Sequence, residues 1–190
     1  MPARVGDNGS YEVMTHQFTL IVEGPDLQAD GRIDELSEAG CDDALVGRTD
    51  GVQYLDFDRD ATSLRDAILS AVSDVERVAD VEVVRIADAG VVSMADIASR
   101  TGRTRESVRL LVAGERGPGG FPPPLTDPRS RYRLWRWYEV ERWFALHFGL
   151  AQPTSGAHVV ETINAALELR YHRRRLDPTD SADLNNLVGL

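Results

Sequence analysis

Lysine is missing from this sequence, and all 21 basic residues among the 190 are arginines. Cysteine is almost missing as well: Cys41 stands alone, which excludes an intramolecular disulfide and a cysteine-rich zinc site. No apolar run is long enough to cross a bilayer. Residues 1–10 lack the charged and then apolar order of a signal peptide. From these absences we expect a cytoplasmic protein that does not associate with membranes.

Sequence patterns of catalysis are also missing. The chain contains no phosphate-binding loop, no Ser-His-Asp order and no pair of catalytic carboxylates in a known motif. The four histidines are scattered without the spacing of metal ligands. We therefore expect a protein that is not an enzyme and that has no metal site and no cofactor.

Two segments could carry chemistry, and for each the plainer interpretation is favoured. Asp56, Asp58 and Asp60 alternate along an expected strand and could attract a hard cation, but no glycine and distal glutamate complete a calcium loop. A solvent-facing strand is the favoured interpretation. Cys41 has no histidine or other base close in sequence, so a nucleophilic or redox role is disfavoured.

The net charge of −10 is distributed unevenly along the chain. Residues 1–88 contain 20 acidic residues and 7 arginines, whereas residues 89–150 contain 6 acidic residues and 10 arginines. Only the second segment has the sign of charge that favours an approach to DNA. Genome composition explains the use of arginine in place of lysine, although arginine also suits forked contacts to guanine and phosphate.

Residues 94–113, MADIASRTGRTRESVRLLVA, have the spacing of a helix-turn-helix. Ala98 is small enough for two helices to cross closely, and Gly102 follows where the turn favours a residue that tolerates positive φ. Val108 and Leu111 fall on one side of the second helix. In such a motif the second helix enters the major groove of DNA. The expected helix caps are Ser93, with Asp96 as its capping-box partner, and Thr104.

The segment after this motif carries a family resemblance. Residues 134–144, LWRWYEVERWF, contain the aromatic-Arg-x-x-x-Val pattern near which a short helix begins. The segment 91–148, which contains this pattern, resembles the winged helix-turn-helix domains of the MerR and excisionase type. The insertion 114–122, GERGPGGFP, resembles a variant found in small bacterial regulators. This resemblance implies DNA binding, and it departs from the family at the base of the wing, where Trp135 and Trp137 double the usual aromatic residue.

The part of the chain before this segment predicts a separate domain. We expect strands at 16–22, 44–47, 52–57 and 81–86 and helices at 31–40 and 63–78, with Asp50-Gly51 as a hairpin turn. The order β-α-β-β-α-β indicates a ferredoxin-like domain. The expected fold class is therefore α+β: an N-terminal ferredoxin-like β-α-β-β-α-β domain, a winged helix-turn-helix domain and a C-terminal helix. The expected bounds are 12–88 for the acidic ferredoxin-like domain, 91–149 for the winged domain, 156–176 for the C-terminal helix and 177–190 for a polar tail.

Helical spacing also predicts which side chains face inward. The expected inward sets are Ile33, Leu36 and Ala39 in the first helix; Leu64, Ala67, Ile68, Ala71, Val72 and Val75 in the second; and Val140, Trp143, Phe144 and His147 in the helix at 138–148. The C-terminal helix carries a stripe that is a candidate dimer surface, formed by Val159, Val160, Ile163, Ala166 and Leu167.

The second helix of the helix-turn-helix carries the residues that we expect to contact DNA. Arg105 and Arg109 are four residues apart and face outward, so each could make a forked contact with O6 and N7 of guanine. Glu106 could accept a hydrogen bond from cytosine N4 or pair with a neighbouring arginine. The alternative is an exposed, arginine-rich helix without a ligand. The residues expected to contact backbone phosphates are Thr101, Arg103, Thr104 and Ser107.

The expected wing supplies a second set of arginines. Arg129, Arg131 and Arg133 alternate with other residues, so on an extended strand they share one face. That face could follow the DNA backbone or enter a narrow minor groove, and Arg116 would lie at its mouth. The alternative is a solvated hairpin edge whose charges oppose aggregation.

Aromatic residues near the wing are expected to form the core. Phe121 is followed by three prolines. We favour a rigid loop in which Phe121 packs into the core over a proline motif that binds a partner. The spacing of Trp135, Trp137 and Trp143 favours packing over base stacking.

We therefore expect a sequence-specific DNA-binding protein, a bacterial transcriptional regulator that binds double-stranded DNA as a homodimer. The alternative is an antitoxin-like interaction protein whose acidic N-terminal domain binds a partner protein, with DNA binding for autoregulation. A ligand-sensing role for that domain rests on fold analogy alone. The end of the C-terminal helix, Arg170 with Arg173–Arg175, could contact phosphate or the acidic domain of a neighbouring subunit.

Overall fold

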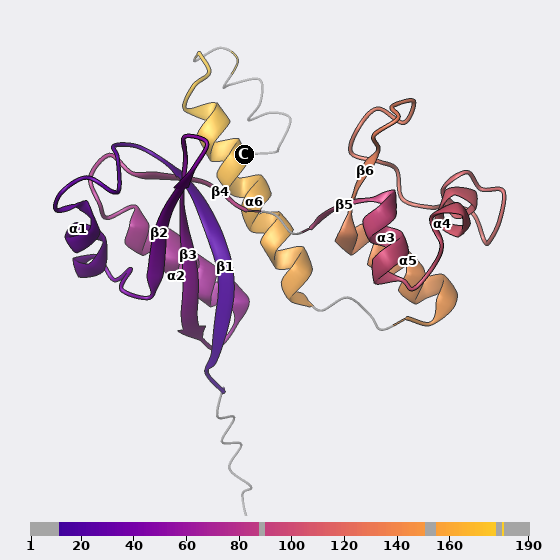
Figure 1. The fold of residues 1–190 in the computed structure, drawn as a ribbon, viewed down its shortest axis with the longest axis horizontal. Coiled ribbons are helices and arrows are strands. Elements are labelled where there is room, and N and C mark those ends of the chain that lie inside the picture. The colour runs from indigo at the N-terminus through magenta and orange to yellow at the C-terminus, as the bar shows by residue number, and fades with distance from the viewer. Residues whose placement is uncertain (1–11, 88–89, 151–154, 178–179, 181–190) are drawn as a thin grey trace, which may run out of the picture. The chain divides into compact units, whose positions relative to one another are not determined.

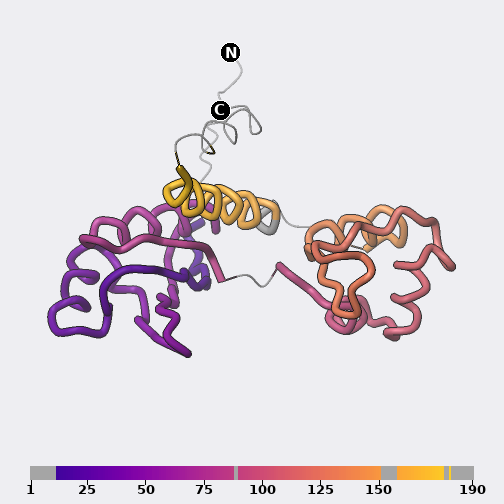
Figure 2. Tube along the Cα trace, turned by 90° about the horizontal axis from the view of Figure 1, so that it is seen from above, coloured from indigo at the N-terminus to yellow at the C-terminus, as the bar shows by residue number. Residues whose placement is uncertain are grey.

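The computed structural model describes residues 12–87, 90–150, 155–177 and 180. The chain forms two compact units (Figures 1 and 2). Unit 1 combines Met1–Ala87 with Ile163–Leu190, and unit 2 is Asp88–Thr162. The described residues form an α+β structure with six helices, a four-stranded antiparallel sheet and a two-stranded sheet. None of these described helices is both long and apolar enough to cross a membrane.

Unit 1 is built on the four-stranded sheet. Its strands stand in the order β2-β3-β1-β4, and every neighbouring pair is antiparallel. The elements follow the predicted order, and β1 and β3 are longer than expected. Their bounds are β1 Met14–Glu23, α1 Arg32–Glu38, β2 Ala44–Thr49, β3 Val52–Ala61, α2 Leu64–Val75 and β4 Glu82–Ile86.

The predicted hairpin turn between β2 and β3 is confirmed. Asp50 and Gly51 have φ values of 50° and 83°, and Thr49 pairs with Val52 across the turn. Two consecutive residues with positive φ are what a two-residue hairpin of this twist requires.

The prediction of inward-facing residues in unit 1 is more accurate for α2 than for α1. All the expected residues of α2 from Ala67 to Val75 are buried, with Leu64 partly exposed. In α1 only Leu36 is buried, and the prediction for Ile33 is wrong, because that side chain is 55% exposed. α1 has only two turns, and Ile33 near its start remains exposed while Leu36 near its end is buried.

Unit 2 contains three helices and the two-stranded sheet that pairs β5 with β6. α5 begins at Trp137, one residue before the start expected for the helix at 138–148. His147 was expected to be buried and is exposed, because it lies in the last turn of its helix, although its ring centre is 5.0 Å from that of Trp143. The bounds are β5 Val91–Ser93, α3 Met94–Arg100, α4 Arg105–Val112, β6 Leu134–Arg136 and α5 Trp137–Phe148.

The last helix, α6, covers Ser155–Arg173. Its residues from Ile163 onward belong to unit 1 and lie against the sheet (Figure 2). Of the stripe expected to form a dimer surface, Leu167 is buried within the chain itself and Ala166 is exposed; Asn164 is also buried. The Asn164 amide accepts a hydrogen bond from the Ile86 N–H (2.6 Å) and donates one to the Ile86 carbonyl (3.1 Å). An asparagine side chain thereby satisfies backbone groups on the outer edge of β4.

Several predictions fall on residues that the structure does not describe. The last residue of the expected N-terminal domain, Asp88, and nearly all of the polar tail expected at 177–190 lie outside the described residues. Most of the segment between the expected winged domain and the expected C-terminal helix lies outside them as well.

Candidate nucleic-acid interface

The turn between α3 and α4 has the geometry that its sequence predicts. Gly102 has a φ of 63°. The Arg103 N–H donates to the Ala98 carbonyl at 2.9 Å, and the Gly102 N–H donates to the Ser99 carbonyl at 3.3 Å. This pair of bonds is the Schellman arrangement in which glycine ends a helix. The chain therefore reverses within a few residues and starts α4 directly.

Both predicted helix caps are confirmed. The Ser93 hydroxyl accepts a hydrogen bond from the Asp96 N–H, and the Asp96 carboxylate accepts one from the Ser93 N–H, which completes a capping box. The Thr104 hydroxyl accepts a hydrogen bond from the Ser107 N–H at 3.1 Å. These caps fix the start of each helix and so the direction of its exposed side chains.

One side of α4 is fixed to the core of unit 2. Val108 and Leu111 are 0% and 2% exposed and join the buried cluster that contains Ile97 and Trp135. The opposite side leaves Arg105 and Glu106 exposed, with Ser107 and Arg109 half-exposed. Among the described residues Arg105 makes no hydrogen bond or ion pair. Its charge is therefore available to a ligand.

Arg109 lies between two carboxylates. Its Nε donates to both Glu106 oxygens at 3.1 and 3.0 Å, and its Nη2 donates to Glu106 Oε1 at 3.0 Å. Its Nη1 and Nη2 donate to the two Glu115 oxygens at 3.4 and 3.3 Å. These hydrogen bonds raise the pKa of Arg109 and lower the pKa of Glu106. From the sequence Arg105 and Arg109 were expected to play the same role. In the structure Arg105 is unpaired and Arg109 is paired.

The end of α4 is held by another glycine turn. Gly114 has a φ of 69°, and the N–H groups of Glu115 and Arg116 donate to the Leu110 carbonyl at 3.0 and 3.2 Å. This turn positions Glu115 beside the helix and leaves Arg116 exposed just beyond it. Glu115 was not identified from the sequence as a site residue. The signal that could have identified it is a glutamate directly after the glycine that ends a helix.

The loop after α4 is anchored by aromatic residues. Phe121 makes edge contacts with Trp135, Trp143 and Phe144 at ring-centre distances of 4.9 to 6.3 Å. The indole N–H of Trp135 donates to the Pro122 carbonyl, and that of Trp143 donates to the Gly119 carbonyl. The interpretation of Phe121 as a core residue is confirmed, and so is that of the buried Trp135 and Trp143; Trp137 is only partly buried.

The prediction that Arg129, Arg131 and Arg133 share one face of a strand is wrong. Residues 127–133 form turns, and the only strand nearby is the three-residue β6. A strand needs a partner, and β5 offers three residues, so pairing stops at Leu134. The loop closes on itself instead, through hydrogen bonds such as that from the Ser130 N–H to the Asp127 carbonyl.

The three arginines of this loop differ in their surroundings. Arg129 forms a two-pronged ion pair with Asp127 at 3.0 and 2.8 Å, which raises the pKa of Arg129. The guanidinium of Arg131 lies 5.8 Å from the Tyr132 ring centre, and that of Arg133 lies 5.7 Å from the Trp135 ring centre. The loop therefore presents separate cations in place of one ordered row.

Arg103 has a partner that sequence analysis did not find. Its guanidinium lies over the rings of Phe144 and Phe148, at 5.3 and 4.4 Å from their centres. The two phenylalanines are four residues apart on α5 and so share one side of it. This contact attaches the turn between α3 and α4 to α5 and leaves the guanidinium at the half-exposed margin of the turn.

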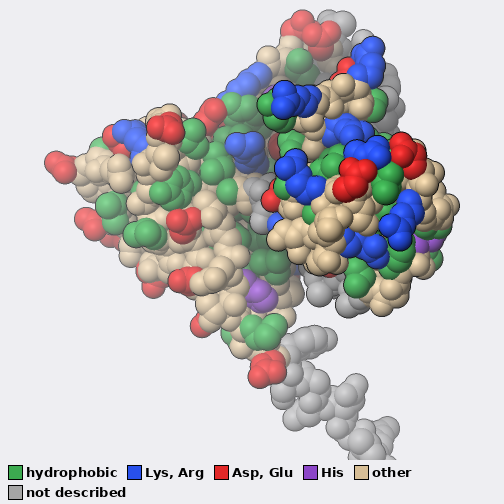
Figure 3. Space-filling view, turned by 45° about the vertical axis from the view of Figure 1, so that its right-hand side comes forward, with side chains coloured by type: hydrophobic (Ala, Val, Ile, Leu, Met, Phe, Trp, Pro, Cys, Tyr) green, Lys and Arg blue, Asp and Glu red, His purple; other side chains and the backbone are tan. Residues whose placement is uncertain are grey.

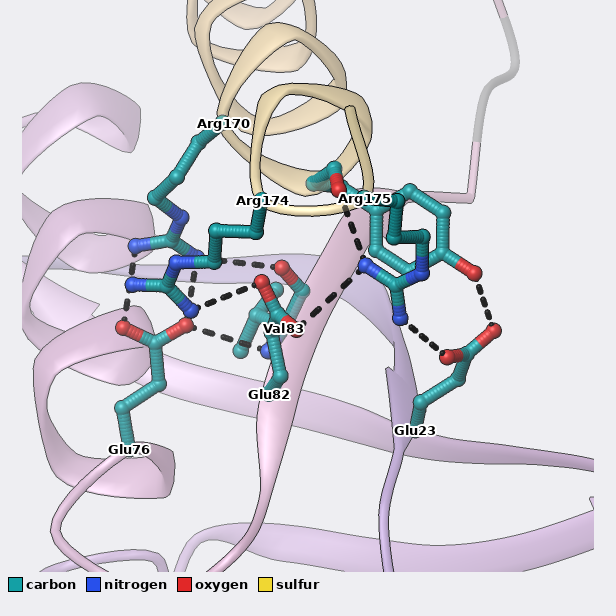
Figure 4. A network of polar contacts seen from close by, with 8 residues as sticks. Glu23, Glu76, Glu82, Val83, Arg170, Arg174 and Arg175 are labelled. Carbon is teal, nitrogen blue, oxygen red and sulfur yellow. Dashed lines mark hydrogen bonds and ion pairs between the residues drawn. The ribbon is translucent and has the colours of Figure 1, made fainter. Parts of the chain in front are cut away.

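The arginines at the end of α6 pair within unit 1 (Figure 4). Arg170 binds Glu76 and donates to the Val83 carbonyl, Arg174 pairs with Glu82 at 2.9 Å, and Arg175 pairs with Glu23 at 2.8 Å. The expectation of contacts to phosphate or to a neighbouring subunit assumed that these side chains were unpaired. Three of the four are engaged with acidic residues of unit 1 itself, which are distant in sequence.

The aspartates of β3 hydrogen-bond to uncharged side chains. Asp56, Asp58 and Asp60 accept hydrogen bonds from Thr19, Gln17 and Thr15 of β1, at 2.6 to 2.8 Å. Over the residues that the structure describes, no three histidine, cysteine, aspartate or glutamate side chains gather closely enough to hold a metal ion.

Figure 3 shows one face of the molecule, on which arginine side chains of unit 2 alternate with hydrophobic and a few acidic ones. No family model, no curated protein and no solved structure matches the chain. The assignment of function therefore rests on the residues and their geometry.

Proposed function

We propose that the protein is a sequence-specific DNA-binding protein, a transcriptional regulator that inserts α4 into the major groove. In this proposal unit 2 is a winged helix-turn-helix of the MerR and excisionase type, and unit 1 is ferredoxin-like. The observation that carries the proposal is α4 itself. It is capped by Thr104, fixed to the core by Val108 and Leu111, and it presents the unpaired Arg105.

The distribution of charge supports the proposed placement of α4 in the major groove of DNA. The segment 89–150 has four more arginines than acidic residues in a chain whose net charge is −10. Arg105 is the first residue of α4 and Arg116 follows its end, so a cation lies at or near each end of the helix. Phosphates on either side of a major groove are the anions that such a distribution would meet.

Arg105 is the residue proposed to read a base, and the others are proposed to position the protein. Thr104 and Ser107 lie at the start of α4, where backbone N–H groups favour an anion. Arg103, Arg116, Arg129, Arg131 and Arg133 are proposed to contact phosphates as separate points along the backbone.

A dimer is proposed because one short helix makes few base contacts. α4 has eight residues, of which two, Arg105 and Glu106, are exposed. Two copies related by a two-fold axis would double these contacts and would read an inverted repeat.

The first experiment is selection of genomic fragments by the purified full-length protein at near-physiological salt. Enrichment of a few fragments that share an inverted repeat would support a dimeric regulator and would identify its targets. Uniform recovery of all fragments would contradict sequence-specific binding, and recovery of none would contradict DNA binding by the protein alone.

A matched pair of variants then tests the role of Arg105. Arg105→Ala should weaken binding to the enriched fragment by about 1–3 kcal/mol while binding to unrelated DNA changes less. Arg65→Ala removes the same charge from an exposed position of unit 1 and should leave both affinities nearly unchanged. The affinity of the parent protein should also fall steeply with rising salt, because phosphate contacts release counterions.

A second candidate function is supported by the acidic sheet of unit 1. The carboxylates of Asp56, Asp58 and Asp60 lie in a row and bind only hydroxyl and amide groups in the described structure. An antitoxin-like protein would use such a surface to bind a basic partner protein, and DNA binding would then serve autoregulation. Replacement of all three by asparagine should release a product of an adjacent gene that co-purifies with the parent protein.

A further inference from the structure

Arg109 has a distinctive environment on α4, because both forks of its guanidinium are occupied. The side-on fork, Nε with Nη2, binds Glu106, and the end-on fork, Nη1 with Nη2, binds Glu115. A guanidinium contacts a guanine base or a phosphate through one of these forks. In the structure as it stands, neither fork is available to DNA.

The three side chains form what we call the Arg109 cluster, and its formal charge is −1. The side chains of Glu106 and Glu115 are 65% and 55% exposed, so the two carboxylates face solvent on either side of the 43% exposed arginine. A phosphate that approaches the cluster meets two like charges for one opposite charge. A guanine edge carries no formal charge, and it offers two acceptors with the spacing of one fork.

The two glutamates are not equivalent. Glu106 lies one turn before Arg109 on the same helix and makes three contacts of 3.0 to 3.1 Å. Glu115 reaches Arg109 from the turn after the helix, at 3.3 and 3.4 Å. The longer and weaker contacts should break first. The end-on fork is then freed, while Glu106 still holds the side-on fork and the orientation of the guanidinium.

We propose that the Arg109 cluster sets the sequence selectivity of α4, with Glu115 as a competitor that withholds Arg109 from phosphates and yields it to a guanine. This inference rests on the proposed DNA-binding function. An exposed ion pair contributes a factor of roughly two to five in equilibrium. A forked contact to guanine discriminates between bases by roughly 5- to 160-fold. The free-energy cost of breaking the ion pair between Arg109 and Glu115 is therefore smaller than the free energy gained from a forked contact between Arg109 and guanine.

The cluster itself can be tested without DNA. In nuclear magnetic resonance spectra of the full chain, Glu106→Gln and Glu115→Gln should each shift the Arg109 Nε–Hε signal. Glu139→Gln removes the same charge from an exposed position on α5 and should not shift it. An Arg109 signal that is identical in all four proteins would overturn the cluster.

The effect of the cluster on binding is measured as the affinity of each variant for two duplexes of equal length. One duplex has alternating dG and dC, and the other has alternating dA and dT. Glu115→Gln should tighten binding to both duplexes by about two- to five-fold. The larger factor is expected for the dA-dT duplex, where the freed Arg109 gains phosphate contacts, so the parent's preference for the dG-dC duplex should narrow. Glu139→Gln should change both affinities by less and leave the preference unchanged. Equal effects of the two variants would overturn the proposal while leaving DNA binding intact.

A double variant shows whether Glu115 acts through Arg109. In an Arg109→Ala background, Glu115→Gln should have no more effect on either duplex than Glu139→Gln has, because the withheld cation is gone. A full effect of Glu115→Gln without Arg109 would reduce Glu115 to a simple repulsive charge and would overturn the proposal. If the parent and every variant bind neither duplex, the proposed function fails, and the selectivity mechanism fails with it.

Discussion

Arginine has opposite roles in the two units. In unit 1 the Arg59 side chain is 8% exposed and binds Asp43 and Asp74 at 2.7 Å. In unit 2 Arg103 lies over the rings of α5, and Arg105 has no polar partner in the described structure. Arg59 is therefore an internal ion-pair partner in unit 1, whereas Arg105 is an unpaired surface cation in unit 2.

The difference follows from what fills each core. Unit 2 packs Phe121, Trp135, Trp143 and Phe144 together and has few carboxylates, so its arginines remain at the surface. Unit 1 has an aliphatic core and an excess of acids, and its arginines are drawn to them.

The largest expected effect is the loss of the internal arginine of unit 1. Arg59→Met leaves the carboxylates of Asp43 and Asp74 half-buried without their cation, and it should lower the free energy of unfolding by about 3–5 kcal/mol. Hydrogen exchange of β3 amides would report this loss. All three tryptophans lie in unit 2. Their fluorescence during unfolding by denaturant should therefore differ little between Arg59→Met and the parent protein.

Arg65→Met is the matched control for that substitution. Its side chain is 61% exposed and pairs only with the neighbouring Asp66, so its removal should change stability by less than about 0.5 kcal/mol. Similar losses for the two variants would contradict the distinction between internal and surface arginines.

The corresponding substitution in unit 2 removes an aromatic ring. Phe121→Ala takes away the edge contacts to three other rings and should cost about 2–3 kcal/mol, less than for a fully buried phenylalanine. Tryptophan fluorescence should follow this unfolding. Tyr132→Ala, at a ring that is 76% exposed, should be almost neutral, and a cost as large as that of Phe121→Ala would refute the assignment of the loop core.

A smaller effect is expected where α6 meets the edge of the sheet in unit 1. Asn164→Ala leaves the N–H and carbonyl of Ile86 without their side-chain partner and should cost about 2 kcal/mol. The exchange rate of the Ile86 N–H should rise. Glu168→Ala, at an exposed position of the same helix, should leave that rate unchanged.

The smallest effect is a pH dependence confined to unit 1. Burial raises the pKa of Cys41 to about 11 despite the nearby Arg59, so the native state keeps its proton while the unfolded thiol loses it. Stability should therefore fall as pH rises above 9, by about 1 kcal/mol between pH 9 and 10. Cys41→Ala should remove this increment, and an identical pH profile for both proteins would contradict it.

Local signals in the sequence predicted local structure well. The Asp50-Gly51 turn, the Ser93 and Thr104 caps and the positive φ of Gly102 were all identified correctly, because each depends on a few adjacent residues. The positions of α2 and of the aromatic core also followed from periodicity.

What could not be predicted depends on residues far apart in the chain. Arg170 and Glu76 are 94 residues apart, and no local pattern indicates that they pair. The strand expected at Arg129–Arg133 failed for a related reason, since alternation alone does not supply a partner strand. At the candidate interface the α4 side chains were identified, but the pairing of Arg109 with Glu115 required the geometry of the turn at Gly114.

The discontinuity of unit 1 has a consequence for synthesis. Its sheet is complete once residue 87 has been made, but the helix residues that cover β4 begin at Ile163, after the whole of unit 2. At usual rates of translation the interval is roughly 4 to 15 s. During that time a nascent chain exposes an unpaired strand edge, so two chains on one message could pair through β4 before Asn164 arrives.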